Sequence, residues 1–171
     1  VSMMVFKEIS ADQFQESPFH LIGKEWMLVT AETGGKRNVM TASWGGLGVM
    51  WNKNAAFVVI RPQRYTKEFI DAADTFSLTF FDECFREKMA YIGTTSGRKE
   101  DKIVRAGLTV RHDGPTPYYE EADAALICRK MYAQPMSENA FIDRAAAEQW
   151  YPDKDFHTLY IAEVMKILVK A

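Results

Sequence analysis

Runs of apolar and β-branched residues dominate the first half of the chain and predict strands. Residues 25–31 form an apolar run that ends at a glycine pair, and residues 36–47 resume the pattern, so the two segments are predicted to pair as a hairpin. Residues 55–60 are rich in β-branched side chains and predict a third strand. This strand ends before Pro62, because proline lacks the N–H that a ladder needs.

The second half continues with strands that are longer and further apart. Residues 75–81 alternate polar with apolar side chains, which is typical of a strand with one polar face. Residues 124–133 and 156–169 predict two long strands that close the chain. Residues 113–119 contain one glycine and two prolines, so this segment is predicted to be a loop.

Short helical segments interrupt the strands without alternating with them. Thr66 is predicted to cap a short helix, and further helices are predicted over residues 82–92, 100–106 and 143–149. Because strands and helices do not alternate regularly, the pattern argues against a doubly wound parallel sheet. The pattern favours a mainly β fold, an antiparallel barrel with short helices, and the length fits one domain over residues 1–171.

Composition and charge narrow the class of protein. Hydrophobic residues make up 47 % of the chain, enough for a sizeable core, and the net charge of −2 argues against a nucleic-acid partner. Cys84 and Cys128 lie far apart in apolar stretches and are expected to be buried free thiols. With three scattered histidines, no metal site is expected.

The absence of a long apolar run indicates the cellular compartment in which we expect the protein. No run approaches the roughly 20 residues that span a bilayer, so no membrane partner is expected. Residues 1–7 are too short and too soon interrupted by charge to form a signal peptide. We therefore expect a soluble cytoplasmic protein.

One strand carries side chains that are unusually small and polar. In the segment NVMTASWGG, residues 38–46, Thr41 and Ser43 share one face by the two-residue period of a strand. The glycines that follow would let a flat ligand approach the backbone. A strand that ends in a glycine bulge explains the same pattern equally well. The residues alone leave both interpretations open.

Two clusters of cations and hydroxyls lie further along the chain. Residues 61–67 contain two arginines before a predicted helix, and residues 94–102 contain three hydroxyls with Arg98, Lys99 and Lys102. Arginine forks and free backbone N–H groups at a helix start bind phosphate. A solvated turn is the alternative for each cluster taken alone. No glycine-rich dinucleotide motif or Walker-type loop is present, so a nucleotide cofactor would need another architecture.

Taken together, these segments resemble the flavin reductase-like family, and within it the flavoredoxin-like group. The resemblance rests on residues 38–46, 60–66, 96–102 and 157–164, in matching order and spacing, and covers about residues 20–168. It implies the FMN-binding split barrel, a six-stranded Greek-key barrel decorated by short helices. It also implies a homodimer with FMN near the subunit interface, to which Trp150 and Tyr151 could contribute.

The resemblance also assigns cofactor-binding residues. By analogy the strand would contact FMN through Asn38, Thr41, Ala42, Ser43 and Trp44. The phosphate and ribityl region is matched by Arg61, Arg64, Tyr65 and Thr66, and a second anchoring loop by Ser96, Gly97, Arg98 and Lys102. His157 matches a histidine near the flavin in many reductases and is the catalytic candidate. That histidine is commonly preceded by Gly-Asp, whereas Asp155-Phe156 precedes it here.

The resemblance leads to three hypotheses for function. The first is an FMN-dependent oxidoreductase that passes electrons from NAD(P)H to free flavin, ferric complexes or a redox protein partner. The second is an electron-transfer flavoprotein without a nicotinamide site. The third is a non-catalytic FMN-binding module. In the first two the cofactor carries the electrons, and the protein orients it and tunes its potential.

Overall fold

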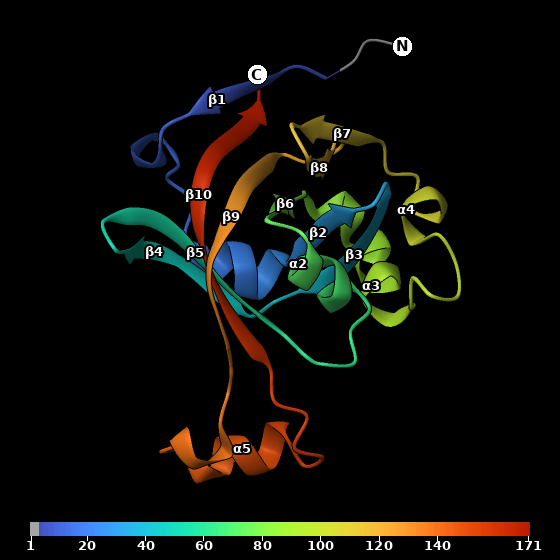
Figure 1. The fold of residues 1–171 in the computed structure, drawn as a ribbon. Helices are drawn as coiled ribbons and strands as arrows, with labels where there is room; N and C mark the ends of the chain where they lie inside the picture. The colour runs from blue at the N-terminus through green and yellow to red at the C-terminus, as the bar shows by residue number, and fades with distance from the viewer. Residues whose placement is uncertain (1–3) are drawn as a thin grey trace.

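A curved antiparallel sheet with helices on its outside forms the body of the protein (Figure 1), in a computed structural model that describes residues 4–171. A small lobe around α5 (Arg144–Trp150) hangs from the ends of two long strands. The expectation about residues 1–7 falls partly outside the described residues.

Strands form most of the described chain. They are β1 (Phe6–Ile9), β2 (Met27–Thr33), β3 (Lys36–Ala42), β4 (Gly45–Met50), β5 (Lys53–Ile60), β6 (Thr75–Phe80), β7 (Val110–Asp113), β8 (Thr116–Tyr119), β9 (Ala124–Pro135) and β10 (Thr158–Lys170). The helices besides α5 are α1 (Pro18–His20), α2 (Thr66–Ala72), α3 (Arg86–Thr94) and α4 (Lys102–Arg105). Short turns of other helix types cover Ala11–Gln13, Leu21–Glu25, Glu83–Phe85 and Glu138–Ala140.

The long strand β10 pairs with other strands along both of its edges. The strand order is β3-β2-β6-β9-β10-β5-β4, and β1 also pairs with β10. Because β10 has 13 residues, one of its edges holds two strands: residues 158–163 pair with β5 and residues 167–170 with β1. The sheet therefore has eight strands in place of the six that the resemblance implied. All of its ladders are antiparallel, as expected.

The two edge strands of the sheet, β3 and β4, follow each other in the chain. Only Ser43 and Trp44 lie between them, and no ladder joins β3 to β4 within residues 4–171. The prediction of one strand over residues 36–47 was therefore wrong. The chain leaves β2, its partner along β3, and turns to pair with β5 along β4. The barrel is split at this point.

Two apolar clusters pack against the two faces of the sheet, one inside the barrel and one outside it. The barrel interior contains Met27, Val29, Leu78 and Leu126, none more than 1 % exposed. Leu28 points the other way and joins a second cluster, in which α3 and α4 pack against the outer face of β2 and β3. Residues 27–31 of β2 are thus buried on both faces, which explains why this part of the strand is apolar apart from Thr30.

Three local expectations were wrong. The predicted loop over residues 113–119 contains β8, which forms a hairpin with β7 around Gly114 at a φ of 55°. The N-cap of α2 is Tyr65, because the Thr66 hydroxyl accepts a hydrogen bond from a neighbouring strand and Thr66 is the first helical residue. Cys128 is buried as expected, but Cys84 is exposed in the turn after β6.

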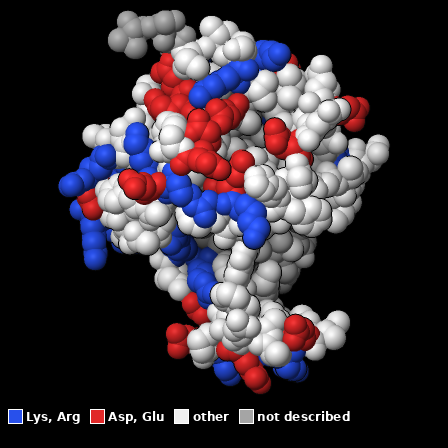
Figure 2. Space-filling model, turned by 180° about the vertical axis from the view of Figure 1, so that it is seen from behind, with Lys and Arg blue, Asp and Glu red and all other residues white. Residues whose placement is uncertain are grey.

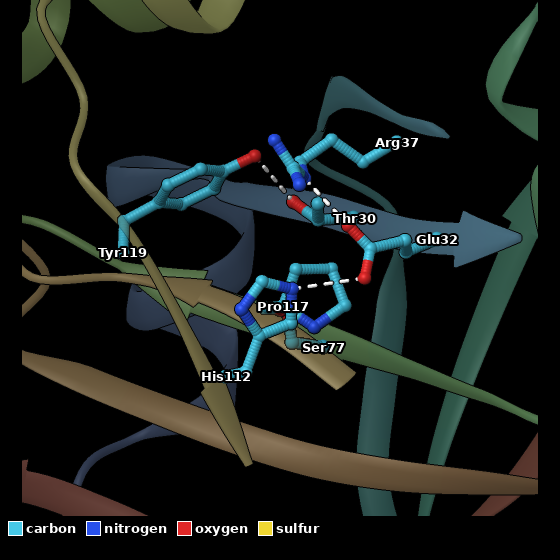
Figure 3. A network of polar contacts seen from close by, with 7 residues as sticks. All are labelled: Thr30, Glu32, Arg37, Ser77, His112, Pro117 and Tyr119. Atoms are coloured by element: carbon cyan, nitrogen blue, oxygen red, sulfur yellow. Dashed lines mark hydrogen bonds and ion pairs between the residues drawn. The ribbon is translucent and has the colours of Figure 1, made fainter. Parts of the chain in front are cut away.

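Polar contacts tie the β7–β8 hairpin to the main sheet (Figure 3). Glu32 on β2 lies between two partners and accepts from Arg37 at 2.7 Å and from His112 at 2.9 Å. Deeper in, the Thr30 hydroxyl donates to the Tyr119 hydroxyl at 3.0 Å, and both residues are fully buried. The hairpin is therefore held by a specific buried hydrogen bond as well as by apolar contacts.

The surface carries both signs of charge. Figure 2 shows acidic and basic side chains side by side over the body and the α5 lobe. Many of them form exposed ion pairs, such as Lys166 with Asp113 at 3.0 Å and Lys154 with Glu138 at 3.5 Å. Within residues 4–171, no helix is both long and apolar enough to cross a membrane.

Removing one side of the Thr30–Tyr119 hydrogen bond should cost more than removing both. We expect Tyr119→Phe to lower the free energy of unfolding by about 1–3 kcal/mol, because the Thr30 hydroxyl would stay buried without a partner. Adding Thr30→Val should recover part of this loss, because the double variant leaves neither hydroxyl of the pair buried without a partner. The measurement is a double-mutant cycle by denaturant unfolding. Strictly additive losses would show that the two hydroxyls do not interact.

Candidate functional site

The three segments singled out in the sequence meet at Asn38, which is 6 % exposed on β3. Its amide nitrogen donates to the Thr66 hydroxyl at 2.9 Å. A Cβ placed on Gly97 would lie 2.0 Å from the Asn38 amide oxygen, so the backbone of the second loop lies directly against this side chain. The polar strand and both cationic turns therefore converge, as their assignment to one site requires.

The C-terminal end of α3 organises the polar side chains around Asn38. The last turn of a helix leaves carbonyl oxygens without helical partners, and these carry partial negative charge. Here two side chains donate to carbonyls of this end, Lys102 to Ile92 at 2.9 Å and Arg64 to Gly93 at 3.1 Å. Thr41 donates to the Met89 carbonyl, about one turn earlier in the same helix, at 2.6 Å.

Arg64 and Lys102 are neighbouring cations, of which Lys102 is buried and Arg64 is half-buried. Lys102 is only 4 % exposed, and burial together with the charge of Arg64 lowers its pKa to about 8. Burial also lowers the pKa of Arg64. Within residues 4–171, neither cation forms an ion pair with a carboxylate, so both keep an unbalanced charge near neutral pH. Two such charges side by side favour an anion between or beside them.

A hollow of about 270 Å³, here called the β3–β4 hollow, opens beside the split in the barrel. Seven of the predicted site residues line it, namely Thr41, Ala42, Ser43, Trp44, Arg61, Arg64 and His157. The lining is completed by Met40, Val59 and Trp150, which sequence reasoning did not place in the site. The hollow thus has a cationic side and an aromatic side.

A second hollow of about 410 Å³, here called the α4 hollow, lies next to Asn38. Asn38, Tyr65, Gly97 and Lys102 all contribute to its lining. Three of the predicted residues, Thr66, Ser96 and Arg98, line neither hollow.

Each of those three has a partner within the chain. Thr66 is buried against Asn38, and the Ser96 hydroxyl accepts from the backbone N–H of Arg98 at 3.2 Å. The guanidinium of Arg98 covers the Tyr65 ring at 4.1 Å and pairs with Glu68 at 3.1 Å. Through these contacts the three residues support the side chains that line the two hollows.

His157 lies at the buried end of the β3–β4 hollow, just before β10. It is 7 % exposed, its Nδ1 shares a hydrogen bond of 2.6 Å with the Tyr151 hydroxyl, and its ring lies 5.4 Å from that of Trp44. Burial, followed by the charge of Arg61, lowers the pKa of His157 to about 4, against a smaller opposing effect of Asp155. The imidazole is therefore neutral at physiological pH.

Arg61 is bound to the α5 arm, defined here as residues 136–157. Its guanidinium donates to the Trp150 carbonyl at 2.9 Å and pairs with the Asp155 carboxylate at 3.0 Å. Gln63 donates to the same carboxylate at 2.7 Å. Sequence reasoning missed Gln63 and Asp155, because nothing local indicates that a turn after β5 meets a segment some ninety positions later. Tyr151, considered for a subunit interface, is buried in its own chain.

The comparisons with known proteins agree with this geometry. A family model described as "Flavin reductase like domain" matches residues 19–171. The comparison with curated proteins found no match.

Solved structures give the same result for the fold. The FMN-binding domain of a flavin reductases-like enzyme from Shewanella baltica aligns with a TM-score of 0.71 at 18 % identity, over 99 % of this chain and 80 % of that one. Flavoredoxin from Methanosarcina acetivorans aligns with a TM-score of 0.67 at 22 % identity, over 84 % and 67 %. Flavoredoxin of Desulfovibrio vulgaris gives 0.66 at 22 %, over 85 % and 68 %. These likenesses confirm the predicted split-barrel fold.

The lowered pKa of His157 makes folding sensitive to acid. The unfolded chain binds a proton at this residue near pH 6.5, whereas the folded chain resists it down to about pH 4. Between these values the unfolded state holds more protons, so the contribution of His157 to stability falls as the pH drops from 6.5 to 4. We expect His157→Gln to flatten this part of the stability curve, measured by denaturant unfolding at a series of pH values.

The exposed His20 supplies a matched control. Its side chain lies at the surface beside Glu25, so His20→Gln should leave the curve unchanged. An acid-side slope in His157→Gln as steep as in the wild type would show that other groups cause it.

Proposed function

Since the chain belongs to the flavin reductase-like domain family, we propose that it binds FMN across the two hollows and works as an oxidoreductase. The observation that carries this proposal is the pair of the half-buried Arg64 and the buried Lys102, neither of which has a carboxylate partner within residues 4–171. A ligand with a phosphate would balance that charge, and FMN supplies one. The S. baltica structure is described as FMN-binding, which supports the choice of cofactor.

We assign the phosphate to Arg64 and Lys102. The carbonyls of Ile92 and Gly93 fix both side chains in place, so their geometry exists before a ligand arrives. Lys102, with a pKa of about 8, is cationic at neutral pH and loses this charge in mildly alkaline solution. Arg61 is tied to the α5 arm, and we assign it no direct part in holding the phosphate.

We assign the flavin ring to the β3–β4 hollow. The small side chains of Thr41, Ala42 and Ser43 leave room for a flat molecule against the strand. Ser43 and Trp44 lie outside both neighbouring ladders, which leaves their main-chain groups for the polar edge of a ring. When bound, FMN would supply the redox chemistry, and the chain would orient it and restrict the access of water.

His157 takes a supporting part in this proposal. Because it is neutral at pH 7, it offers a hydrogen bond and a ring face without a positive charge. The Tyr151 hydroxyl fixes its orientation through Nδ1. We propose NAD(P)H as the electron donor and free flavin, ferric complexes or a redox protein as acceptor. We also propose that the chain acts as one domain and as a homodimer.

Replacing Arg64 should weaken the binding of the phosphate group and leave the binding of the flavin ring nearly unchanged. We expect Arg64→Met to weaken FMN binding at least tenfold while changing riboflavin affinity by less than about threefold, because riboflavin lacks the phosphate that this cation would hold. Flavin-fluorescence titrations of both ligands measure the difference. Arg105→Met removes an exposed arginine paired with Glu100 and serves as the control. Equal losses for both ligands would reject the assignment of the phosphate to Arg64.

The electron donor can be tested on the FMN-loaded protein. We expect NADH or NADPH to bleach the bound flavin under anaerobic conditions, in both cases by two-electron reduction. If dithionite reduces the flavin but neither nucleotide does, the proposed donor is wrong and a different electron source must serve the protein. A protein that takes up no FMN would reject the cofactor itself.

A further inference from the structure

The α5 arm brings one aromatic side chain to the rim of the β3–β4 hollow. The arm leaves the barrel at Pro135 on β9 and returns at Thr158 on β10, two residues that pair directly. Figure 1 shows it as a separate lobe below the sheet. Of the seven residues of α5, the last, Trp150, lines the hollow.

Trp150 and Trp44 form an aromatic side of this hollow. Their rings meet edge to face with centroids 5.0 Å apart, and the His157 ring follows 5.4 Å beyond Trp44. Trp150 is 46 % exposed and Trp44 is 40 % exposed. Two neighbouring indoles that are left this open at the mouth of a hollow offer a ring-binding surface, because aromatic faces and edges attract further planar rings.

Specific polar contacts hold Trp150 in place. No residue of α5 is buried, so apolar burial contributes little to the position of the helix. The arm is held instead where Arg61 binds the Trp150 carbonyl and the Asp155 carboxylate, with Gln63 on the same carboxylate. Because Arg61 and Gln63 follow directly after β5, the barrel itself determines how far Trp150 reaches over the hollow.

We propose that Trp150 is a specificity-determining residue that selects a planar aromatic second reactant for this site, with Arg61 as its positioning residue. The inference rests on the proposed function, since the second reactant would meet the FMN held in the same hollow. Nicotinamide and free flavin are both planar aromatic rings and are the two sources of this chemistry to be distinguished. A compact, non-aromatic reactant gains nothing from the indole.

The test uses the FMN-loaded protein and binding without turnover. The probes are NAD⁺, followed by the absorbance of the bound flavin, and lumichrome, followed by its fluorescence anisotropy. The variants are Trp150→Leu, which keeps an apolar side chain but removes the ring, and Trp150→Phe, which restores a ring. Ile142→Ser changes a residue of the same arm that is 99 % exposed and does not line the hollow.

We expect Trp150→Leu to weaken at least one probe by about fivefold or more, in line with the loss of one aromatic contact. Trp150→Phe should bind that probe within about twofold of the wild type, as should Ile142→Ser. Each variant is saturated with FMN before the titration, so that a change in FMN affinity does not enter the comparison of the probes. The probe that responds identifies the source of the ring.

Three outcomes would overturn the inference, and they differ from failure of the proposed function. If the loaded wild type binds neither probe, or if Trp150→Leu binds both as tightly as the wild type, Trp150 does not select the second reactant. Equal weakening in Trp150→Phe and Trp150→Leu would also reject a role for the ring. If the wild type takes up no FMN, the proposed function fails first and this inference fails with it.

Discussion

The carbonyl oxygens at the C-terminal end of α3 determine where the polar groups of the site lie. A helix end inside a protein must find donors for these oxygens, because leaving them unpaired is costly. In this chain these donors come from the turn before α2 and from the start of α4, and β3 donates to a carbonyl about one turn earlier in the helix. One helix thereby fixes three segments, the first and last of which are about sixty positions apart in sequence. The same contacts hold the half-buried Arg64 and the buried Lys102 without a carboxylate partner in the described part of the chain.

The three cations of the site divide into two groups with different tasks. Arg64 and Lys102 donate to the end of α3, and we propose that they supply the charge for a ligand. Arg61 looks equivalent in the sequence, yet its guanidinium is committed to the α5 arm and to Asp155. The binding of an anion and the placement of the aromatic rim are thus assigned to separate residues. A change in one of these functions need not disturb the other.

The sequence predicts the strands well, because burial on one or both faces imposes a pattern that can be read locally. It predicts the polar strand and the cationic turns as candidates, but not the contact of Gly97 with Asn38 that joins them. The break at Ser43 was not predictable, because alternation continues through it and only the change of pairing partner reveals it. The place of Trp150 depends on Arg61, and no local pattern encodes a contact of that range.

The base of the arm has an evolutionary consequence. Pro135 and Thr158 are ladder partners, so the arm is in effect an insert between two residues that already lie side by side. Such an insert can lengthen or shorten without shifting the register of β9 and β10, whereas a residue added inside either strand must be absorbed as a β-bulge, as at the two existing register shifts, or it turns the following side chains to the wrong face. The arm can therefore diverge more freely than the two strands that carry it.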